Sequence, residues 1–429
     1  MNARFRLVTI KANRRLGSVY VMALGAAMFV TVAGVSAVLV LRVNRRANEM
    51  TADFADARFV AQSAVELGDL DMRSDANWRR NKPNGMWRSN QPLGRGALYL
   101  SVIDPLDGNL EDDTSEDVLL TGIGLVGTAR YKLSVEFEPK DPPGMDCLES
   151  AVHTNVLLSV NSTVNVDAPI SSNGTVQVGL TGILNGNAEA VAAVVVLGVH
   201  NGAATNGIEA KETPAATVFD YYIAQALPLA VSALPLNLTR REIRNVVISP
   251  GSNPYGGLTH PQGLYLLDCA GTPIVIKNSR IHGTLVILDP GVGSSIQGNV
   301  LWERYNAQLP ALLVRGSIDF AWSGSLTESN APATNFNPAG SPYSGVTDTD
   351  TTDTYPGKIK GLIFVSSVLT ISNIETIDGV VVTAGLSLGI NQKLTVTHDP
   401  SIILAPPPGF ERSKRTMGPV AGSWRQIVD

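Results

Sequence analysis

The stretch 19-VYVMALGAAMFVTVAGVSAVLVL-41 carries no charged side chain over its 23 residues. At a rise of about 1.5 Å per residue, a helix of this length covers the roughly 30 Å hydrocarbon core of a bilayer. The stretch therefore predicts a single membrane-spanning helix near the N-terminus, and it decides how the rest of the chain is arranged.

Basic residues flank the apolar stretch on both sides. Those before it are Arg4, Arg6, Lys11, Arg14 and Arg15, and those after it are Arg42, Arg45 and Arg46. This modest bias favours a cytoplasmic N-terminus, with nearly everything after the helix exported. A cleaved secretory signal is the competing interpretation, but its apolar region is typically about 7 to 15 residues and ends in a small-residue site. Here an arginine closes the stretch instead.

The helix is expected to continue beyond the membrane. Neither proline nor glycine interrupts residues 44–67, and small or apolar residues recur there at helical spacing. The stripe consists of Phe54, Ala57, Ala61, Ala64, Val65 and Leu67. The pattern predicts one continuous helix of about 50 residues.

The pair Gly17-Ser18, the apolar helix and the closing Ala57-Arg-Phe-Val-Ala-Gln-Ser-Ala-Val-Glu66 form a recognisable combination. It resembles the N-terminal region of the PilX-like and general-secretion K-like minor pilins. In that family a prepilin peptidase cuts a basic leader after a glycine, and the exposed helix packs into a pilus or pseudopilus. The resemblance implies that Gly17 is the cleavage-site glycine and Ser18 the new N-terminus. Many pilins carry glutamate at the fifth mature position, where this chain has Met22.

The same resemblance implies where the protein lies and what it contacts. It implies a bacterial inner-membrane protein that crosses once, with its N-terminus in the cytoplasm and its bulk in the periplasm or on the cell surface. Other pilin-like or secretion-system subunits would be its partners. A plain single-pass anchor that is never processed is the alternative interpretation.

Composition excludes some classes of function. The formal net charge of -5 and the pI near 5.6 provide no basic field for nucleic acid, so no nucleic-acid partner is expected. Cys147 and Cys269 both fall in the exported part, where they either pair or stay as buried thiols. Without a C-x-x-C pair, a thiol-rich zinc site is excluded.

A small antiparallel sheet is expected after the helix. Residues 97–103, 118–125 and 130–137 alternate or cluster apolar side chains between turns, whereas residues 77–96 look like an irregular connector.

The acidic residues Glu111, Asp112, Asp113, Glu116 and Asp117 are interpreted as a solvated loop rather than a metal site. Gly122-x-Gly-x-x-Gly127 matches the glycine motif of dinucleotide-binding proteins. In those proteins a helix follows the motif, whereas here a strand is expected, so dinucleotide binding is not expected.

A repeated pattern of aliphatic-x-Gly followed by a strand dominates the second half of the chain. It begins at Ile281, Ile296, Val314, Ile359 and Ile377, at spacings of 15, 18, 45 and 18 residues. Stacked coils satisfy the hydrogen bonds of short strands and build one continuous apolar column. The pattern predicts a parallel β-helix, with a β-sandwich as the alternative.

The expected organisation has five parts in chain order. They are a basic cytoplasmic leader (1–17), a transmembrane and pilin-like helix (18–76), a connector with a small antiparallel sheet (77–147), a parallel β-helix (148–405) and a C-terminal strap (406–429). Two insertions are expected to interrupt the β-helix. The insertion at 217–244 contains a short helix that would cap or brace the solenoid, and the insertion at 327–356 is a polar loop.

The sequence contains few candidates for chemistry. Asp348, Asp350 and Asp353 gather hard oxygen ligands that suit calcium, and a solvated acidic loop is the competing interpretation. The five histidines are scattered, and no G-x-S-x-G occurs. We therefore expect no catalytic residues and no cofactor.

The C-terminal half also resembles a known class. Pro406-Pro-Pro-Gly-Phe410 and the glycine-led strands at Gly361 and Gly379 resemble exported β-helix proteins with a PilX-type N-terminus, and this implies a structural role. We expect a non-enzymatic envelope protein, minor-pilin-like and associated with a pilus or secretion system, that displays a β-helix for assembly or adhesion to a carbohydrate or cell surface. The alternatives are an anchored polysaccharide lyase or glycosidase and a plain envelope scaffold.

Overall fold

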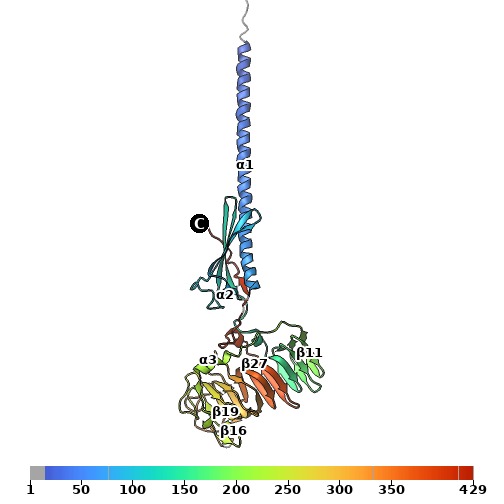
Figure 1. Ribbon diagram of the computed structural model, residues 1–429, viewed down its shortest axis with the longest axis vertical. Coiled ribbons are helices and arrows are strands. Elements are labelled where there is room, and N and C mark those ends of the chain that lie inside the picture. Colours follow the sequence, from blue (N-terminus) through green and yellow to red (C-terminus); the bar gives the residue numbers. More distant parts are fainter. Residues whose placement is uncertain (1–14, 76, 331, 414, 429) are drawn as a thin grey trace, which may run out of the picture. The chain divides into compact units, whose positions relative to one another are not determined.

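The computed structural model describes residues 15–75, 77–330, 332–413 and 415–428, with side chains from Val19 onward (Figure 1). The chain forms two compact units. One comprises Met1–Lys140 and Thr416–Asp429, and the other comprises Asp141–Arg415. Most of the predicted basic leader lies outside the described residues.

The first unit is built on one continuous helix, α1 (Arg15–Ser74), as the sequence predicts. The predicted stripe faces the protein, because Ala57, Ala61, Ala64 and Val65 are all buried in one apolar cluster. Phe54 stays half-exposed, with its ring 5.4 Å from that of Tyr131. The C-terminal part of α1 is therefore held by packing, whereas the large apolar side chains from Val19 to Val43 are exposed.

An antiparallel sheet packs against this part of α1 (Figure 1). Its strand order is β1-β2-β3-β4-β29, and β30 also pairs with β4. The elements are α2 (Trp78–Asn81), β1 (Gly85–Leu93), β2 (Gly96–Ile103), β3 (Val118–Val126), β4 (Ala129–Pro139), β29 (Met417–Pro419) and β30 (Arg425–Gln426). The three predicted strands are confirmed as β2, β3 and β4.

The expectation of an irregular connector at residues 77–96 is wrong. Most of this segment forms α2 and β1, and β1 pairs antiparallel with β2. The register shifts between Met86 and Arg88 and again between Arg88 and Gln91. Such irregularities move side chains from one face to the other, which removes the alternation that identifies a strand in sequence.

The C-terminal residues also belong to this sheet. Met417 pairs with Pro139 and Arg425 pairs with Ser134, so β29 and β30 both lie along β4. The prediction of a strap over 406–429 is therefore wrong for its second half. The sheet is completed by strands from opposite ends of the chain, and the second unit is inserted between them.

The second unit is a parallel β-helix, which confirms the predicted fold and excludes the β-sandwich. Its first strands are β5 (Val152–Val160), β6 (Thr163–Val166), β7 (Ile170–Ser172), β8 (Thr175–Val178), β9 (Ile183–Asn185), β10 (Ala188–Ala190), β11 (Ala193–Val196), β12 (Val199–Asn201) and β13 (Ala204–Asn206). Parallel pairs such as β5 with β7 and β8 stack one coil on the next.

The later strands complete the stack. They are β14 (Leu227–Pro228), β15 (Leu236–Asn237), β16 (Arg240–Arg244), β17 (Val247–Ile248), β18 (Leu264–Asp268), β19 (Ile274–His282), β20 (Thr284–Leu288), β21 (Ser295–Glu303), β22 (Leu312–Arg315), β23 (Ile318–Trp322), β26 (Lys358–Ile371), β27 (Ile374–Leu388) and β28 (Lys393–Thr397). Aliphatic side chains from both sets form one continuous core.

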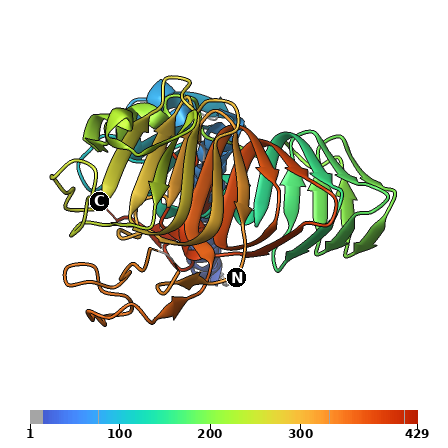
Figure 2. The ribbon, with the colours of Figure 1, turned by 90° about the horizontal axis from the view of Figure 1, so that it is seen from below.

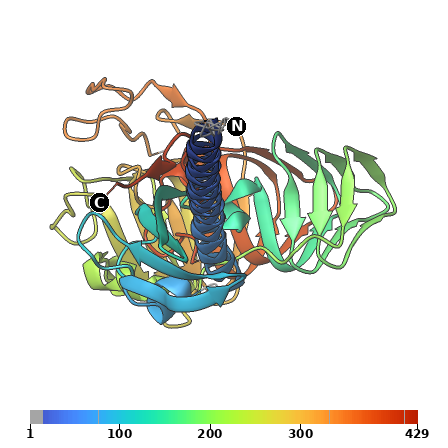
Figure 3. The same cartoon turned by 90° about the horizontal axis from the view of Figure 1, so that it is seen from above.

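The order of coils in space differs from their order in sequence. β5 pairs with β27 on one side and with β7 and β8 on the other, so the first coil lies in the middle of the stack. The chain runs outward from there to β13 and then begins again at the opposite end with β14. It returns coil by coil until β27 and β28 close against β5 and β6. Figures 2 and 3 show the β7–β13 coils (green) at one end of the stack.

The sequence predicts that the five aliphatic-x-Gly copies occupy one column of the β-helix. In the structure they do not all do so. Ile281 is in register with Trp302, which is followed by Ile359 and Ile377. Ile296 instead pairs with Phe320, and Val314 pairs with Val365, in two other columns. Each coil has several aliphatic faces, so the same short pattern arises at different corners.

A short helix braces the outside of one solenoid face. It is α3 (Val218–Gln225), within the predicted insertion at 217–244, and the end of that insertion supplies β14 to β16. Phe219 lies 5.7 Å from Phe364 between ring centroids, and the Tyr222 hydroxyl donates to the Pro408 carbonyl at 2.8 Å. With α4 (Ser401–Leu404) it covers an apolar outer face of β18, β20, β26 and β27.

The polar loop at 327–356 is fastened at both ends and in the middle. β24 (Leu326–Thr327) pairs antiparallel with β25 (Thr354–Tyr355) and closes the base of the loop. In the middle, the buried Arg280 of β19 donates to the carbonyls of Phe336, Ser341 and Pro342, each at 2.7 Å. This predicted insertion is therefore an ordered part of the second unit.

Candidate functional site

The exposed half of α1 is a long apolar surface of the first unit. The helix from Val19 is long and apolar enough to cross a membrane. Its large side chains are 50 to 80% exposed from Val19 to Val43, and Met22 is 75% exposed. The predicted processing residues Gly17 and Ser18 lie within α1, but their side chains are outside those described. An apolar surface of this kind must be covered by lipid or by other helices.

The predicted calcium ligands lie near one another in the structure. Asp348 and Asp350 lie together with Glu328, their ligand atoms within 4.8 Å of one another. Asp353 accepts from the Tyr355 hydroxyl at 3.2 Å and shares the Asn337 amide with Asp348. Sequence reasoning missed Glu328, because only the fold brings the start of the loop next to Asp348.

Glu328 is fully engaged with its own loop. Its carboxylate accepts from the backbone amides of Phe336 and Asp353 and from the Tyr355 hydroxyl. These donors stabilise the buried carboxylate. We conclude that the Glu328 cluster fastens the loop.

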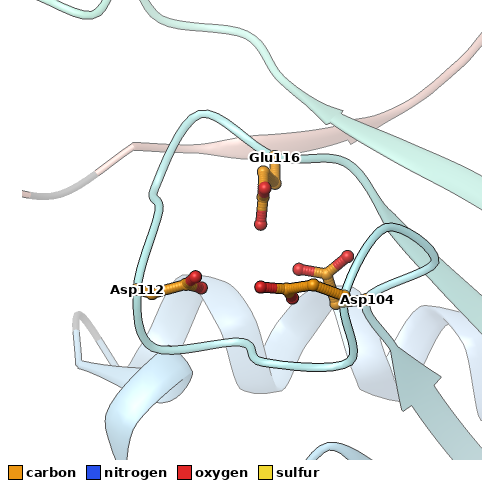
Figure 4. Close-up of side chains that lie close together, drawn as sticks. Asp104, Asp112 and Glu116 are labelled. Atoms are coloured by element: carbon orange, nitrogen blue, oxygen red, sulfur yellow. The ribbon is translucent and has the colours of Figure 1, made fainter.

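A second acidic group lies in the loop between β2 and β3. Asp104, Asp107, Asp112 and Glu116 place one ligand oxygen each within 4.8 Å of one another. Figure 4 shows the carboxyl groups of Asp104, Asp112 and Glu116 directed toward one another. Of the five acidic residues expected in a solvated loop, Glu116 is half-buried and the other four are exposed, whereas Asp104, which that expectation did not include, is 4% exposed.

The carboxyl groups of this cluster repel one another when all of them are ionised. Among the described residues, Asp104 Oδ2 and Glu116 Oε2 are buried and accept no hydrogen bond as carboxylates. A proton held between them lets Glu116 bond to Asp104, and this raises the pKa of Glu116 to about 7, with burial and the neighbouring aspartates adding to the effect. Sequence reasoning missed the group because Asp104 lies at the end of a strand, eight residues before Asp112.

A hollow of about 280 Å³ on the solenoid is lined by His282, Glu303, Arg304, Tyr305, Ala307 and Lys360. Burial and the Arg280 charge lower the pKa of His282 to about 4, so this imidazole is neutral. Glu303 is the one carboxylate in this lining, whereas glycosidase chemistry uses two.

The two cysteines are separate in the described structure. Both are free and buried, Cys147 in the cluster under α3 and Cys269 in the solenoid core. Burial raises the pKa of Cys147 and raises that of Cys269 to about 12, so both thiols stay protonated. A thiolate-based function at either residue is disfavoured.

Glu375 of β27 is a buried acid inside the solenoid. It is 0% exposed, and neither carboxyl oxygen has a partner of good hydrogen-bond geometry among the described residues. Burial, followed by the charge of Asp319, raises the pKa of Glu375 to about 9. The group is therefore neutral in the folded protein at pH 7.

Glu375→Gln is expected to stabilise the second unit and to flatten its pH dependence. The folded-state pKa lies above the unfolded value, so the wild type is destabilised as pH rises from about 4.5 to about 9, by about 3 kcal/mol at pH 7. Urea unfolding of both proteins at pH 4.5 and pH 7.5 measures this, with Glu209→Gln as an exposed control. Equal stabilities of wild type and Glu375→Gln at pH 7.5 would show that the carboxyl is not neutral.

Comparisons with known proteins give no family for this chain. No family model matches it, and no curated protein matches it. The competence-associated pilin ComZ from Thermus thermophilus is 9% identical at a TM-score of 0.38, covering 88% of this chain and 98% of that one. An ice binding protein from an Antarctic biological consortium is 11% identical at a TM-score of 0.23, covering 60% of this chain and 91% of that one. At these TM-scores neither likeness carries an argument about function.

Proposed function

We propose that the chain is a minor-pilin-like subunit of a pilus or secretion-system filament. A prepilin peptidase would remove the basic leader after Gly17, and α1 would then leave the inner membrane to pack against the helices of other subunits. The bulk of the chain would be exported, with the N-terminus of the precursor in the cytoplasm. Assembly, rather than chemistry, would be its role.

The observation that carries this proposal is the division of α1 into two halves. The half from Val19 to Val43 has no protein partner among the described residues, whereas the half from Ala57 to Met72 is buried against a sheet. A plain membrane anchor needs only the first half. We call the antiparallel sheet and the part of α1 that packs on it the head. A helix that is apolar at one end and packed into the head at the other suits a subunit that moves from the lipid bilayer into a bundle of helices.

The insertion of the β-helix between β4 and β29 supports a role in display. The head keeps a complete sheet on α1, because β29 and β30 return to β4 after the solenoid. Assembly through α1 therefore does not depend on the solenoid strands. The solenoid would present a rigid surface for adhesion to a carbohydrate, a cell surface or another subunit.

The anchored carbohydrate-active enzyme is the less favoured function. Three carboxylates near the coil ends, those of Asp268, Asp289 and Asp319, each have a separate local partner: the Ala270 amide, Arg315 and the Ser372 hydroxyl. We propose that the protein is not an enzyme. Release of reducing sugars from a panel of bacterial polysaccharides would contradict this.

Gly17→Val is expected to abolish incorporation into filaments without unfolding the head. A branched side chain before the scissile bond blocks cleavage by a peptidase that requires glycine there, so the leader would keep the helix in the membrane. The measurement is the amount of protein in the sheared surface fraction of the native host, relative to membranes. Gly25→Ala is the matched control, since a Cβ at Gly25 meets no atom within 4 Å.

The wild type and the Gly25→Ala variant are expected in the sheared fraction, and the Gly17→Val variant only in membranes. Wild-type protein that stays entirely in membranes under conditions where filaments are made would contradict the proposal and leave the plain envelope scaffold.

A further inference from the structure

The hollow of about 280 Å³ on the solenoid places an exposed tyrosine beside charged side chains. Its lining includes Glu303, Tyr305 and Lys360. We propose that this hollow binds one ring of a neutral hexose glycan. The assignment rests on the adhesive role proposed above, and it names the class of ligand and the residues through which the solenoid would adhere.

The polar side chains of the hollow come from stacked coils. His282 ends β19, Glu303 ends β21 and Lys360 lies in β26. His282 is in register with Glu303, and Glu303 is in register with Lys360. Since stacked strands lie about 4.8 Å apart, the row carries a polar group at every step over roughly 10 Å. A ligand with several hydroxyl groups can therefore bond to more than one coil.

Glu303 and Lys360 keep their hydrogen-bonding capacity for a ligand. Within the described part of the chain, neither the carboxylate nor the ammonium group forms an ion pair or a side-chain hydrogen bond. The carboxylate can accept from two neighbouring hydroxyls, and the ammonium can donate to a third oxygen. Such charge-assisted bonds are about twice as strong as neutral ones. His282, which is neutral at pH 7, adds one donor and one acceptor.

Tyr305 supplies an aromatic surface beside these groups. Its side chain is 51% exposed, and the His282 ring packs edge-on against it at 5.2 Å between centroids. This contact holds the tyrosine ring while half of the side chain stays accessible. The face of an aromatic ring is negative and attracts the weakly positive C–H groups that line one side of a sugar ring. An aromatic surface with a few polar groups is typical of small-molecule sites.

The turn that carries Tyr305 is fixed by its neighbour Arg304. The Arg304 guanidinium donates to the Ala307 carbonyl at 3.0 Å and pairs with Asp399 at 3.0 Å. Its side chain is only 12% exposed, so water competes little for these bonds. A wall that is ordered before the ligand arrives lowers the entropy cost of binding.

The charges and the size of the hollow favour a single neutral ring. Arg304 is neutralised by Asp399, and the charges of Glu303 and Lys360 cancel. The carboxylate of a uronic acid would be repelled by Glu303, which selects against acidic sugars. The volume of about 280 Å³ lies just below the roughly 300 to 1,000 Å³ of pockets for drug-sized ligands.

The test is saturation-transfer NMR of the full chain in a detergent without a sugar headgroup. The probes are the methyl glycosides of glucose, galactose and mannose, with glucuronate as the charged comparison. At least one glycoside should bind with a dissociation constant of about 1 mM, and glucuronate at least tenfold more weakly. Transfer to none of the three glycosides at millimolar concentration would overturn the proposal, as would glucuronate that binds as well as the best glycoside.

Two variants assign the binding to this hollow. Tyr305→Ala should weaken glycoside binding at least tenfold, whereas Tyr221→Ala, at a tyrosine of α3 that is 42% exposed, is the matched control and should leave it unchanged. Glu303→Gln should weaken glycoside binding and bring glucuronate closer to it, which a merely structural role would not do. Binding that survives Tyr305→Ala, or that Tyr221→Ala removes, would overturn the assignment.

Failure of this proposal can be told apart from failure of the filament role. A chain that is cleaved after Gly17 and enters filaments but binds none of the glycosides would overturn the sugar site and leave assembly intact. A chain that binds a glycoside but keeps its leader in every fraction would retain the site on a permanently anchored solenoid.

Discussion

Gly124→Ala is expected to destabilise the first unit by about 3 kcal/mol, and Gly124→Val by more. A Cβ at Gly124 would lie 2.0 Å from the Ala57 carbonyl oxygen and 2.7 Å from the Ala61 amide nitrogen. Both atoms belong to the α1 backbone, so no side chain can turn away to make room. The strand β3 or the helix must move, and the buried face between them opens.

The Gly-x-Gly-x-x-Gly match in β3 has a structural cause in this contact. Gly122 and Gly124 both face α1, where the helix presents the small residues Ala57 and Ala61. Glycine on the strand and alanine on the helix let the two backbones approach closely. The motif thus serves helix and strand packing rather than a phosphate.

Hydrogen exchange measures this prediction within one sample. Peptides from 118–126 should lose protection in Gly124→Ala, whereas peptides from 274–288 in the solenoid should not change. Gly385→Ala is the control for a glycine replacement as such, because its nearest atom would lie 3.5 Å from the new Cβ. Unchanged protection of β3 in Gly124→Val would show that α1 and β3 do not pack as described.

Arg280→Met is expected to release the 327–356 loop, at a cost of about 3 kcal/mol. The Arg280 guanidinium donates to three loop carbonyls and stacks 5.4 Å from the Tyr343 ring centre. Methionine fills similar space but leaves those carbonyls without donors. They regain partners only if the loop opens to water.

Limited proteolysis followed by mass spectrometry measures the opening. New cleavage between residues 334 and 346 is expected in Arg280→Met, with the solenoid strands still protected. Arg315→Met is the matched control, since its pair with Asp289 is solvent-exposed on both sides and is worth under about 1 kcal/mol. A loop in Arg280→Met that resists cleavage as well as the wild type would contradict the role given to Arg280.

The features that the sequence predicts are those with a local periodic cause. The uncharged stretch from Val19 to Leu41 predicts α1, and the alternating residues of β3 predict a half-buried strand. β1 escapes prediction because its register shifts interrupt the alternation. The strands β29 and β30 are not predicted from the sequence, because they are short and pair with residues far away in sequence.

The order of the coils could not be predicted for a different reason. A column of aliphatic residues has the same pattern whether its neighbour is the next coil in sequence or a distant one, as β5 beside β27 shows. The acidic sites follow the same rule. Asp348 and Asp350 are close in sequence and in space, whereas Glu328 and Asp104 join their groups only through folding.

N-terminal sequencing and intact mass of the protein from its native membrane and surface fractions test the central proposal most directly. A pilin-type subunit should yield a chain that begins at Ser18, with the leader through Gly17 absent from the filament fraction. A chain that retains the leader in every fraction would contradict processing and assembly, and would leave α1 as a permanent single-pass anchor for the exported β-helix.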